Sequence, residues 1–269
     1  MNFALIGDKI SYSMSPLIHE MISDVALKYS IIEISVEELS AGKPEILKKL
    51  DGFNVTIPHK QEIIKYCNQL DPAAELIGAV NTVQMINGRW KGYNTDFLGF
   101  IASLKESVKN YFDYHPVLIG YGGVARAVIF ALQEMGFKNV SVVGGMDDKE
   151  RRNFINDMNA STKIRLLDTV PELPLLWING TPIGGAKIPD IPEGFLDIHY
   201  GDVLFDLNYT PYPTHLEQYA HKKGVKTVNG LKMLVYQAFE AQKIWFGEKI
   251  QEIDINGVIH TLTHLGTAS

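Results

Sequence analysis

The stretch PVLIGYGGVARAVIFALQEMGFKNVSVV, residues 116–143, decides the fold class of this chain. Its first five residues form an apolar run typical of a buried strand, and GYGG supplies a tight turn. Residues 124–135 then carry apolar side chains at helical spacing as far as Gly136, a residue that commonly ends helices. A second apolar run follows over 139–143. Strand, helix and strand in this order predict a βαβ unit with a parallel sheet.

The turn between this strand and this helix is rich in small residues: Gly120, Gly122, Gly123, Val124 and Ala125. They fit the pattern G-x-G-x-x-G/A, in which small residues let the backbone approach the diphosphate of a dinucleotide. Backbone N–H groups and the positive end of the helix dipole would hold the phosphates, with Arg126 close by. Glycines also form turns without a ligand, but the flanking strand and helix favour nucleotide binding. Tyr121 is an unusually bulky residue beside a diphosphate.

The N-terminal part continues the α/β pattern. We predict strands over 2–7, 31–36 and 53–57 and a helix over 15–29. Asn87-Gly88 between two apolar runs indicates a β-hairpin within residues 80–96, because both residues tolerate the left-handed backbone of a two-residue turn. Further runs predict a helix over 97–108, strands over 173–180 and 202–207, and a long amphipathic helix over 231–246. A chain of 269 residues is long enough for two such domains.

Composition excludes several classes of protein. The net charge of −6 and pI near 5.8 argue against a general nucleic-acid surface, which needs a basic stripe. The single cysteine, Cys67, excludes an internal disulfide and a Cys-cluster metal site. His260 and His264 lack an HExxH context, so we expect no metal. No signal-peptide start and no membrane-length apolar run is present, so we predict a cytoplasmic protein that binds neither nucleic acid nor membrane.

Polar side chains recur at predicted strand ends and in the hairpin, in the segments SMSP (13–16), NVTIPHK (54–60), GAVNT (78–82) and GYNTD (92–96). They include Ser13, Ser15, Thr56, Lys60, Asn81 and Asp96. Hydroxyl, amide, ammonium and carboxylate groups together suit a small polyhydroxylated acid. Any one of these residues can be explained as a cap or turn former, but six at the mouth of one predicted sheet favour a polar small-molecule pocket.

Eight segments also follow the order and spacing of a known family: ISYSMSP, GFNVTIPHK, GAVNTV, GYNTDFLG, GYGGVARA, NGTPIGG, DLNYTPYPT and NGLKMLVYQA. With these segments the chain resembles the shikimate dehydrogenases over nearly its whole length. The resemblance implies a two-domain α/β fold with the active site in the cleft. It implies a substrate-binding domain over 1–108, completed by 231–269, and a Rossmann-type nucleotide-binding domain over 109–230.

The resemblance also implies an activity and a set of site residues. The expected reaction interconverts 3-dehydroshikimate and shikimate with NADP or NAD, as a step in the biosynthesis of aromatic amino acids. The expected oligomeric state is a monomer or a homodimer. The implied catalytic pair is Lys60 and Asp96. The implied substrate contacts are Ser13, Ser15, Thr56, Asn81, Tyr209 and Gln237. The implied cofactor contacts are Gly120, Gly122, Gly123, Val124, Ala125, Asn179, Thr181 and Gly230.

Lys60 lies just after the predicted strand end at Pro58, where a proton donor would meet a ketone. Reduction of a ketone needs a hydride and a proton for the developing alkoxide. An adjacent Asp96 would favour the charged ammonium, whereas burial would oppose it. Two alternatives remain: an NAD-preferring quinate/shikimate dehydrogenase, and a non-catalytic shikimate-binding regulatory module. The presence of both Lys60 and Asp96 argues against the second.

The segment SVVGGMDDKERR, residues 141–152, departs most from the family. NADP-dependent members usually carry an Asn-Arg-Thr motif after this strand, which holds the adenosine 2′-phosphate, and here Gly144, Gly145 and Met146 stand in its place. Asp147 and Asp148 would bond a ribose hydroxyl and repel a phosphate. The nearby bases Lys149, Arg151 and Arg152 could serve the phosphate or simply begin a solvated helix. We therefore predict that the usual strong NADP preference is lost, so that NAD is preferred or both dinucleotides bind weakly.

Overall fold

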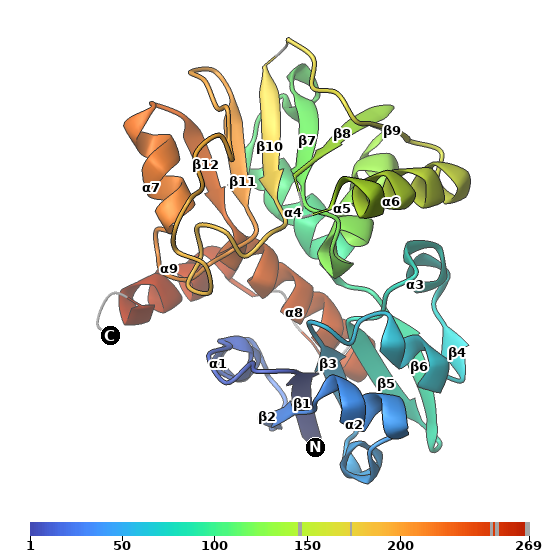
Figure 1. Ribbon diagram of the computed structural model, residues 1–269. Helices are drawn as coiled ribbons and strands as arrows, with labels where there is room; N and C mark the ends of the chain where they lie inside the picture. Colours follow the sequence, from blue (N-terminus) through green and yellow to red (C-terminus); the bar gives the residue numbers. More distant parts are fainter. Residues whose placement is uncertain (145–146, 173, 248–249, 251–252, 267–269) are drawn as a thin grey trace. The chain divides into compact units, whose positions relative to one another are not determined.

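The computed structural model describes residues 1–144, 147–172, 174–247, 250 and 253–266, and divides into two compact units (Figure 1). The first unit comprises Met1–Gly99 and Leu234–Val258. The second comprises Phe100–Met233 and the residues from Ile259 onward. The chain passes from one unit to the other three times, each time within a helix: α4 (Asp96–Ser107), α8 (Gly230–Phe246) and α9 (Ile255–Gly266).

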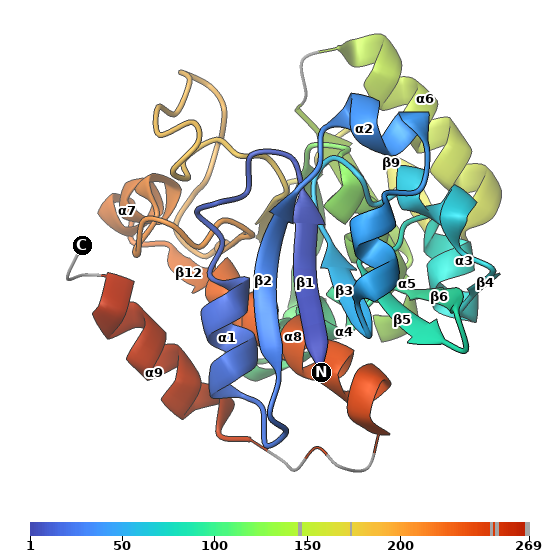
Figure 2. The same cartoon turned by 90° about the horizontal axis from the view of Figure 1, so that it is seen from below.

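The first unit is built on a mixed sheet in the order β2-β1-β3-β5-β6-β4. Its strands are β1 (Asn2–Gly7), β2 (Lys28–Glu33), β3 (Gly52–Val55), β4 (Gln69–Leu70), β5 (Thr82–Ile86) and β6 (Arg89–Tyr93). Its helical segments are α1 (Ser15–Met21), α2 (Val36–Ala41), α3 (Pro72–Ile77) and the 3-10 helices Glu45–Lys49 and Glu62–Tyr66. Strand β1 pairs in parallel with β2 and β3, whereas β5 is antiparallel to β3 and β6. Figure 2 shows β1 between β2 and β3, with α1 beside β2.

The hairpin predicted at Asn87-Gly88 is confirmed. Strands β5 and β6 pair from Thr82↔Tyr93 to Ile86↔Arg89, so only two residues remain in the turn. Asn87 has φ of 50° and Gly88 φ of 74°, both in the left-handed region that such a turn requires.

The predicted helix over 15–29 is wrong in its second half. Helix α1 ends at Met21, and the next element is β2, which starts at Lys28 and replaces the strand predicted over 31–36. The Ser23 side chain closes a local turn, with its hydroxyl donating to the Val25 carbonyl at 2.8 Å. The backbone of 28–33 is then satisfied by the ladder with β1. Pairing with a distant strand therefore overrides the helical spacing of the apolar residues.

The second unit is built on a parallel sheet in the order β12-β11-β10-β7-β8-β9, visible from left to right in Figure 1. Its strands are β7 (His115–Ile119), β8 (Asn139–Val143), β9 (Arg165–Leu167), β10 (Leu175–Asn179), β11 (Val203–Asp206) and β12 (Lys226–Asn229). Its other elements are α5 (Gly123–Met135), α6 (Asp148–Ser161), α7 (His215–Lys222) and the 3-10 helix Tyr111–Asp113. Helix α9 (Ile255–Gly266) follows α8. The predicted βαβ unit is confirmed as β7-α5-β8.

The central strands β1, β7 and β10 are buried on both faces of their sheets, which explains their almost continuously apolar sequences. In β1, Ala4 and Ile6 pack in a cluster with Phe53 and Trp90, whereas Phe3 and Leu5 pack on the opposite face with Trp245 of α8. The mixed α/β class predicted from the sequence is confirmed.

Candidate active site

A lysine, an aspartate and an asparagine meet in the first unit. Lys60 Nζ donates to Asp96 Oδ2 at 2.7 Å, and Asn81 Nδ2 donates to Asp96 Oδ1 at 2.9 Å. The Lys60 and Asp96 side chains are only 12% and 8% exposed. The carboxylate therefore has one oxygen on the ammonium and the other on an amide, an arrangement that fixes the direction of the Lys60 amine.

The backbone around each of these residues explains why they meet. Strand β3 ends at Val55, two residues before the predicted end at 57, because the Thr56 carbonyl accepts from His59 N and turns the chain. Val80 N then donates to the Lys60 carbonyl at 2.7 Å. This bond ties the lysine to the segment that leads into Asn81 and β5.

The side-chain amide of Asn81 has a fixed orientation. Its Oδ1 accepts from the backbone N–H of Thr95 at 2.7 Å, so its Nδ2 must face Asp96. Gln237 Oε1 lies 3.3 Å from the same Nδ2. Gln237 contacts Asn81 although the two residues are 156 positions apart in the sequence. Gln237 is only 7% exposed. The Gln237 side chain is therefore buried beside Asn81 and not exposed on its helix.

The serine pair lies at the start of α1. Ser13 Oγ donates to Ser15 Oγ at 3.1 Å, and Ser15 N donates back to Ser13 Oγ. Ser15 is buried, while Thr56 is half-buried next to β1, bonded through its N–H to Ile6 O. Tyr209 is half-buried and belongs to the second unit. The contacts of these four residues with a substrate remain predictions.

The glycine-rich turn of the second unit fits a diphosphate. Gly120 has φ of 91° and needs to be glycine for its backbone. Gly122 does not: its φ is −72°, and a Cβ built there would meet nothing within 4 Å. The open space beside Gly122 is what close approach of a phosphate requires. Gly122 also caps α5 without a side chain, so no capping group competes for the first N–H groups of that helix.

Two of the predicted cofactor-binding residues, Asn179 and Gly230, also have structural roles. Asn179 is fully buried: its Oδ1 accepts from Thr181 N and Oγ1, and its Nδ2 donates to Asp206 and to the Ile183 carbonyl. Its side chain thus shapes the loop that presents Thr181. A Cβ at Gly230 would collide with the Leu207 carbonyl, so glycine is required there by packing. Their contacts with a cofactor remain predictions.

The loop after β8 carries carboxylates close to the glycine-rich turn. Gly145 and Met146 lie outside the described residues. Asp147 caps α6, accepting from Lys149 N at 2.6 Å and Glu150 N at 3.2 Å. Tyr121 donates its hydroxyl to Glu150 Oε2 at 3.1 Å. No local pattern predicts this bond, because it joins the turn after β7 to the helix that follows β8.

Arg151 of α6 reaches the sheet. Its Nη2 pairs with Asp148 Oδ1 at 3.0 Å, and its Nη1 donates to the carbonyl of Val142 in β8 at 3.5 Å. Its charge is therefore partly balanced by a carboxylate on the same turn of α6.

A buried carboxylate at the end of β11 was missed by the sequence argument. Asp206 accepts from Thr214 Oγ1 at 2.6 Å, Asn179 Nδ2 at 2.9 Å and the backbone and side chain of Asn208. Burial raises the pKa of Asp206 to about 6, and these hydrogen bonds oppose that rise. Asp206 joins two loops that follow parallel strands, a role without a local sequence signal.

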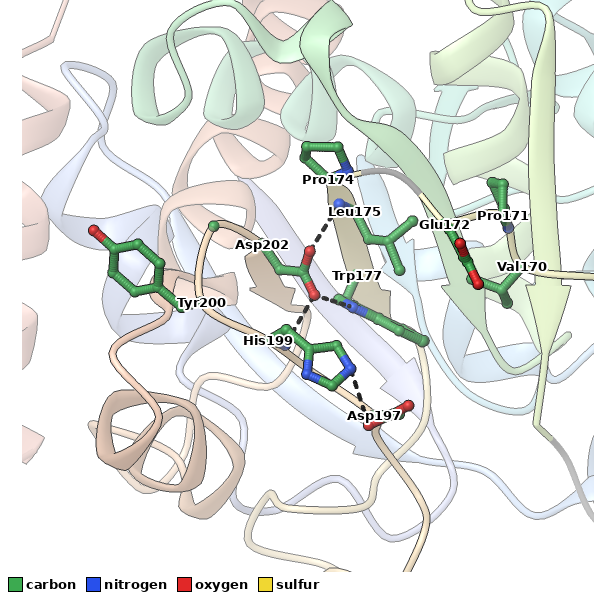
Figure 3. A pocket seen from close by; sticks show the side chains of 11 residues that line it. Val170, Pro171, Glu172, Pro174, Leu175, Trp177, Asp197, His199, Tyr200 and Asp202 are labelled. Carbon is green, nitrogen blue, oxygen red and sulfur yellow. Dashed lines mark hydrogen bonds and ion pairs between the residues drawn. The ribbon is translucent and has the colours of Figure 1, made fainter.

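A pocket of about 630 Å³ lies at a different edge of the second sheet (Figure 3). Its lining includes Pro174, Leu175 and Asp202, at the amino ends of β10 and β11. There Asp202 accepts from Leu175 N, from the Trp177 indole and from His199 N. The glycine-rich turn follows the carboxyl end of β7, where nucleotides bind in parallel sheets, so this pocket is not the predicted cofactor site.

Within the described ranges, no helix combines the length and apolarity needed to cross a membrane. The same residues contain no group of three or more His, Cys, Asp or Glu side chains that could hold a metal ion. Burial raises the pKa of the Cys67 thiol to about 11, which leaves little thiolate for metal binding or nucleophilic chemistry.

Comparison with known proteins identifies the family. Residues 5–83 match the family model for the shikimate dehydrogenase substrate binding domain. A curated shikimate dehydrogenase (NADP(+)) from Clostridium botulinum is 35% identical over 253 residues, covering 90% of this chain and 95% of that protein.

Solved structures agree with this relationship. A shikimate dehydrogenase crystallised with NADP+ has a TM-score of 0.83 at 33% identity, covering 97% of this chain and 96% of that one. A shikimate 5-dehydrogenase from Listeria monocytogenes, crystallised with shikimate and NAD, has a TM-score of 0.81 at 26% identity, with coverage of 97% and 96%. The chain therefore belongs to the shikimate dehydrogenase family of oxidoreductases.

Proposed function

We propose that this protein interconverts 3-dehydroshikimate and shikimate, with the first unit binding the substrate and the second unit binding the nicotinamide dinucleotide. The observation that carries the proposal is the buried Lys60–Asp96–Asn81 cluster. The relatives named shikimate dehydrogenase support it, and so does the open space beside Gly122, where a phosphate can approach the backbone. An intact, ordered cluster also argues against a non-catalytic binding module.

The residues of the cluster divide the chemistry of ketone reduction between them. The dinucleotide, when bound, supplies the hydride that the carbonyl carbon receives. The Lys60 ammonium gives a proton to the carbonyl oxygen as its negative charge develops, and the amine takes a proton back from solvent. Asp96 remains a carboxylate and holds the ammonium in place. Gln237 offers an amide group to the ring hydroxyls, Ser13, Ser15 and Thr56 offer hydroxyls, and Asn81 holds the second carboxylate oxygen of Asp96.

We infer further that the preference for NADP is weak or lost in this chain. Asp147 and Glu150 place two carboxylates beside the segment that would meet the adenosine ribose, and a 2′-phosphate would be repelled by them. Arg151 is already paired with Asp148. A family member crystallised with shikimate and NAD indicates that this cofactor is compatible with the fold.

One assay tests the function and separates the alternatives. Purified protein is mixed with shikimate or quinate, and with NAD or NADP, and formation of the reduced nicotinamide is followed by its absorbance. Turnover of shikimate supports the proposal, and comparable turnover of quinate with NAD favours a quinate/shikimate dehydrogenase. Binding of shikimate by calorimetry without turnover under any combination would indicate a binding module and refute the proposal.

A further inference from the structure

A chain of buried hydrogen bonds leads from Asp96 into the core of the first unit. Asn81 Nδ2 donates to Asp96, and Thr82 Oγ1 donates to Asn81 Oδ1 at 3.0 Å. Asn54 Nδ2 donates to Thr82 Oγ1 at 2.9 Å, and the Tyr29 hydroxyl donates to Asn54 Oδ1 at 2.7 Å. All five residues are at most 5% exposed.

Every bond in this chain runs in one direction. The single proton of the Tyr29 hydroxyl goes to Asn54 Oδ1, so the Asn54 amide nitrogen must face Thr82. That amide occupies a lone pair of the Thr82 hydroxyl, and the hydroxyl proton goes to the nearer of its two acceptors, Asn81 Oδ1 at 3.0 Å, rather than to Thr95 Oγ1 at 3.3 Å. Burial raises the pKa of Tyr29 well above its ordinary value, so it remains a donor at the start of the chain.

Thr82 completes the coordination of Asn81 Oδ1. A carbonyl oxygen has two lone pairs, and here one faces the Thr95 N–H at 2.7 Å, while the Thr82 hydroxyl at 3.0 Å is a nearer donor to the other than the Thr95 hydroxyl at 3.3 Å. With both occupied by donors from the protein, the Asn81 side chain cannot turn its oxygen toward Asp96. Removing the Thr82 hydroxyl would leave only the longer contact from the Thr95 hydroxyl, at 3.3 Å, as the second donor to this oxygen and weaken the constraint on the amide.

We propose that Thr82 is a positioning residue for the Lys60–Asp96 pair, acting through Asn81, and that Tyr29, through Asn54, orients the Thr82 hydroxyl. The proposal rests on the proposed function, in which Asp96 holds the Lys60 ammonium. Asp96 rotation would move the proton donor away from the ketone, and misplacement of a reacting group is costly to rate. The effect should therefore fall on turnover more than on substrate affinity.

The test compares two changes at position 82. Thr82→Val has nearly the same shape but no hydroxyl, whereas Thr82→Ser keeps the hydroxyl. We expect Thr82→Val to lower kcat for shikimate oxidation about tenfold, the size of one lost bond in a charged network, with KM within about twofold. We expect Thr82→Ser to restore most of this loss. Near-normal kcat in Thr82→Val, or equal losses in both variants, would overturn the proposal.

A second pair of variants covers the case in which Thr82→Val does not fold. Tyr29→Phe removes the hydroxyl at the start of the chain, and Tyr66→Phe is its control, because Tyr66 bonds the Leu39 carbonyl elsewhere in the same unit. We expect Tyr29→Phe to lower kcat about threefold and Tyr66→Phe to leave it unchanged. Equal effects of the two changes would count against the proposal.

A readout without turnover separates this proposal from the proposed function. The side-chain NH₂ resonances of Asn81 are assigned in a ¹⁵N spectrum by their absence from Asn81→Asp. We expect Thr82→Val to shift them and speed their exchange with solvent, and Thr82→Ser to leave them near their wild-type positions. Unchanged resonances in Thr82→Val refute the positioning role. An inactive wild-type protein with the expected resonance changes refutes only the proposed function.

Discussion

Lys60 Nζ lies 2.7 Å from Asp96 Oδ2, across 36 residues of sequence, and both side chains are largely withdrawn from solvent. An ammonium and a carboxylate this close attract each other, which holds the lysine amine in one place, and a lysine ammonium is a proton donor of the kind that ketone reduction needs. Asn81 occupies the other carboxylate oxygen, so the pair is held from both sides.

Lys60→Ala should lower kcat for shikimate oxidation by about 10²–10⁴, with a much smaller change in KM, because the group acts mainly on the transition state. Asp96→Asn should also impair turnover. The matched control is Lys65→Ala, since Lys65 pairs with Glu62 on the surface of the same unit. Steady-state kinetics decide the matter, and near-normal kcat in Lys60→Ala would exclude this lysine as the proton donor.

Gln237→Ala should raise KM for shikimate more than it alters binding of the dinucleotide, because the Gln237 amide lies beside Asn81. Tyr209→Phe should act in the same direction. Gln218→Ala, at an exposed glutamine of α7, serves as the control. A crystal structure with shikimate in which Gln237 makes no contact with the ligand would contradict the assignment.

Calorimetric titration should show NAD binding at least as tightly as NADP, because Asp147 and Glu150 bring two carboxylates to the segment that we propose meets the adenosine ribose. Glu150→Gln should then improve NADP binding and leave NAD binding little changed. If NADP instead binds tenfold or more tightly than NAD, the prediction fails, and Arg151→Ala would show whether this arginine holds the phosphate.

Lowering the pH should reduce the stability of the first unit through protonation of His19 in the unfolded chain. Burial lowers the pKa of His19 from 6.5 to about 3, so between these values the unfolded chain takes up a proton that the folded protein does not. Stability then falls as pH decreases below 6.5, by about 3 kcal/mol at a pH near 4.5. Urea unfolding of wild type and His19→Phe, which keeps a ring against Tyr29, measures the effect. If the free energy of unfolding falls with pH equally in both proteins, His19 is not the cause of the loss of stability.

Asp206, in the second unit, should change stability with pH in the opposite direction to His19. Its pKa is raised from 3.8 to about 6, so the folded protein binds the proton more tightly than the unfolded chain does. Its contribution to stability therefore grows as pH falls from about 6 to 4, by about 3 kcal/mol in all. The difference in unfolding free energy between wild type and Asp206→Asn should widen in favour of wild type over that range. A constant difference would mean that the carboxylate titrates near its ordinary value.

Local sequence signals were sufficient for the elements that depend on a few neighbouring residues. The βαβ unit around Gly120, the hairpin at Asn87-Gly88 and the end of α5 at Gly136 follow from backbone preferences and apolar spacing within single segments. The family motifs also predicted that Lys60 and Asp96 form a pair. Such signals failed for residues 22–33, where the ladder between β1 and β2 decided the conformation.

Only the tertiary structure decided which polar groups share a hydrogen bond. Gln237 reaches Asn81 from a distant helix, and Tyr29 is joined to Asp96 through three intervening side chains. Asp147 is engaged as a helix cap rather than standing free in its loop. The reason is physical: backbone preference is set by neighbours along the chain, whereas burial, amide orientation and shifts of pKa depend on atoms that strand pairing and packing bring together from remote segments.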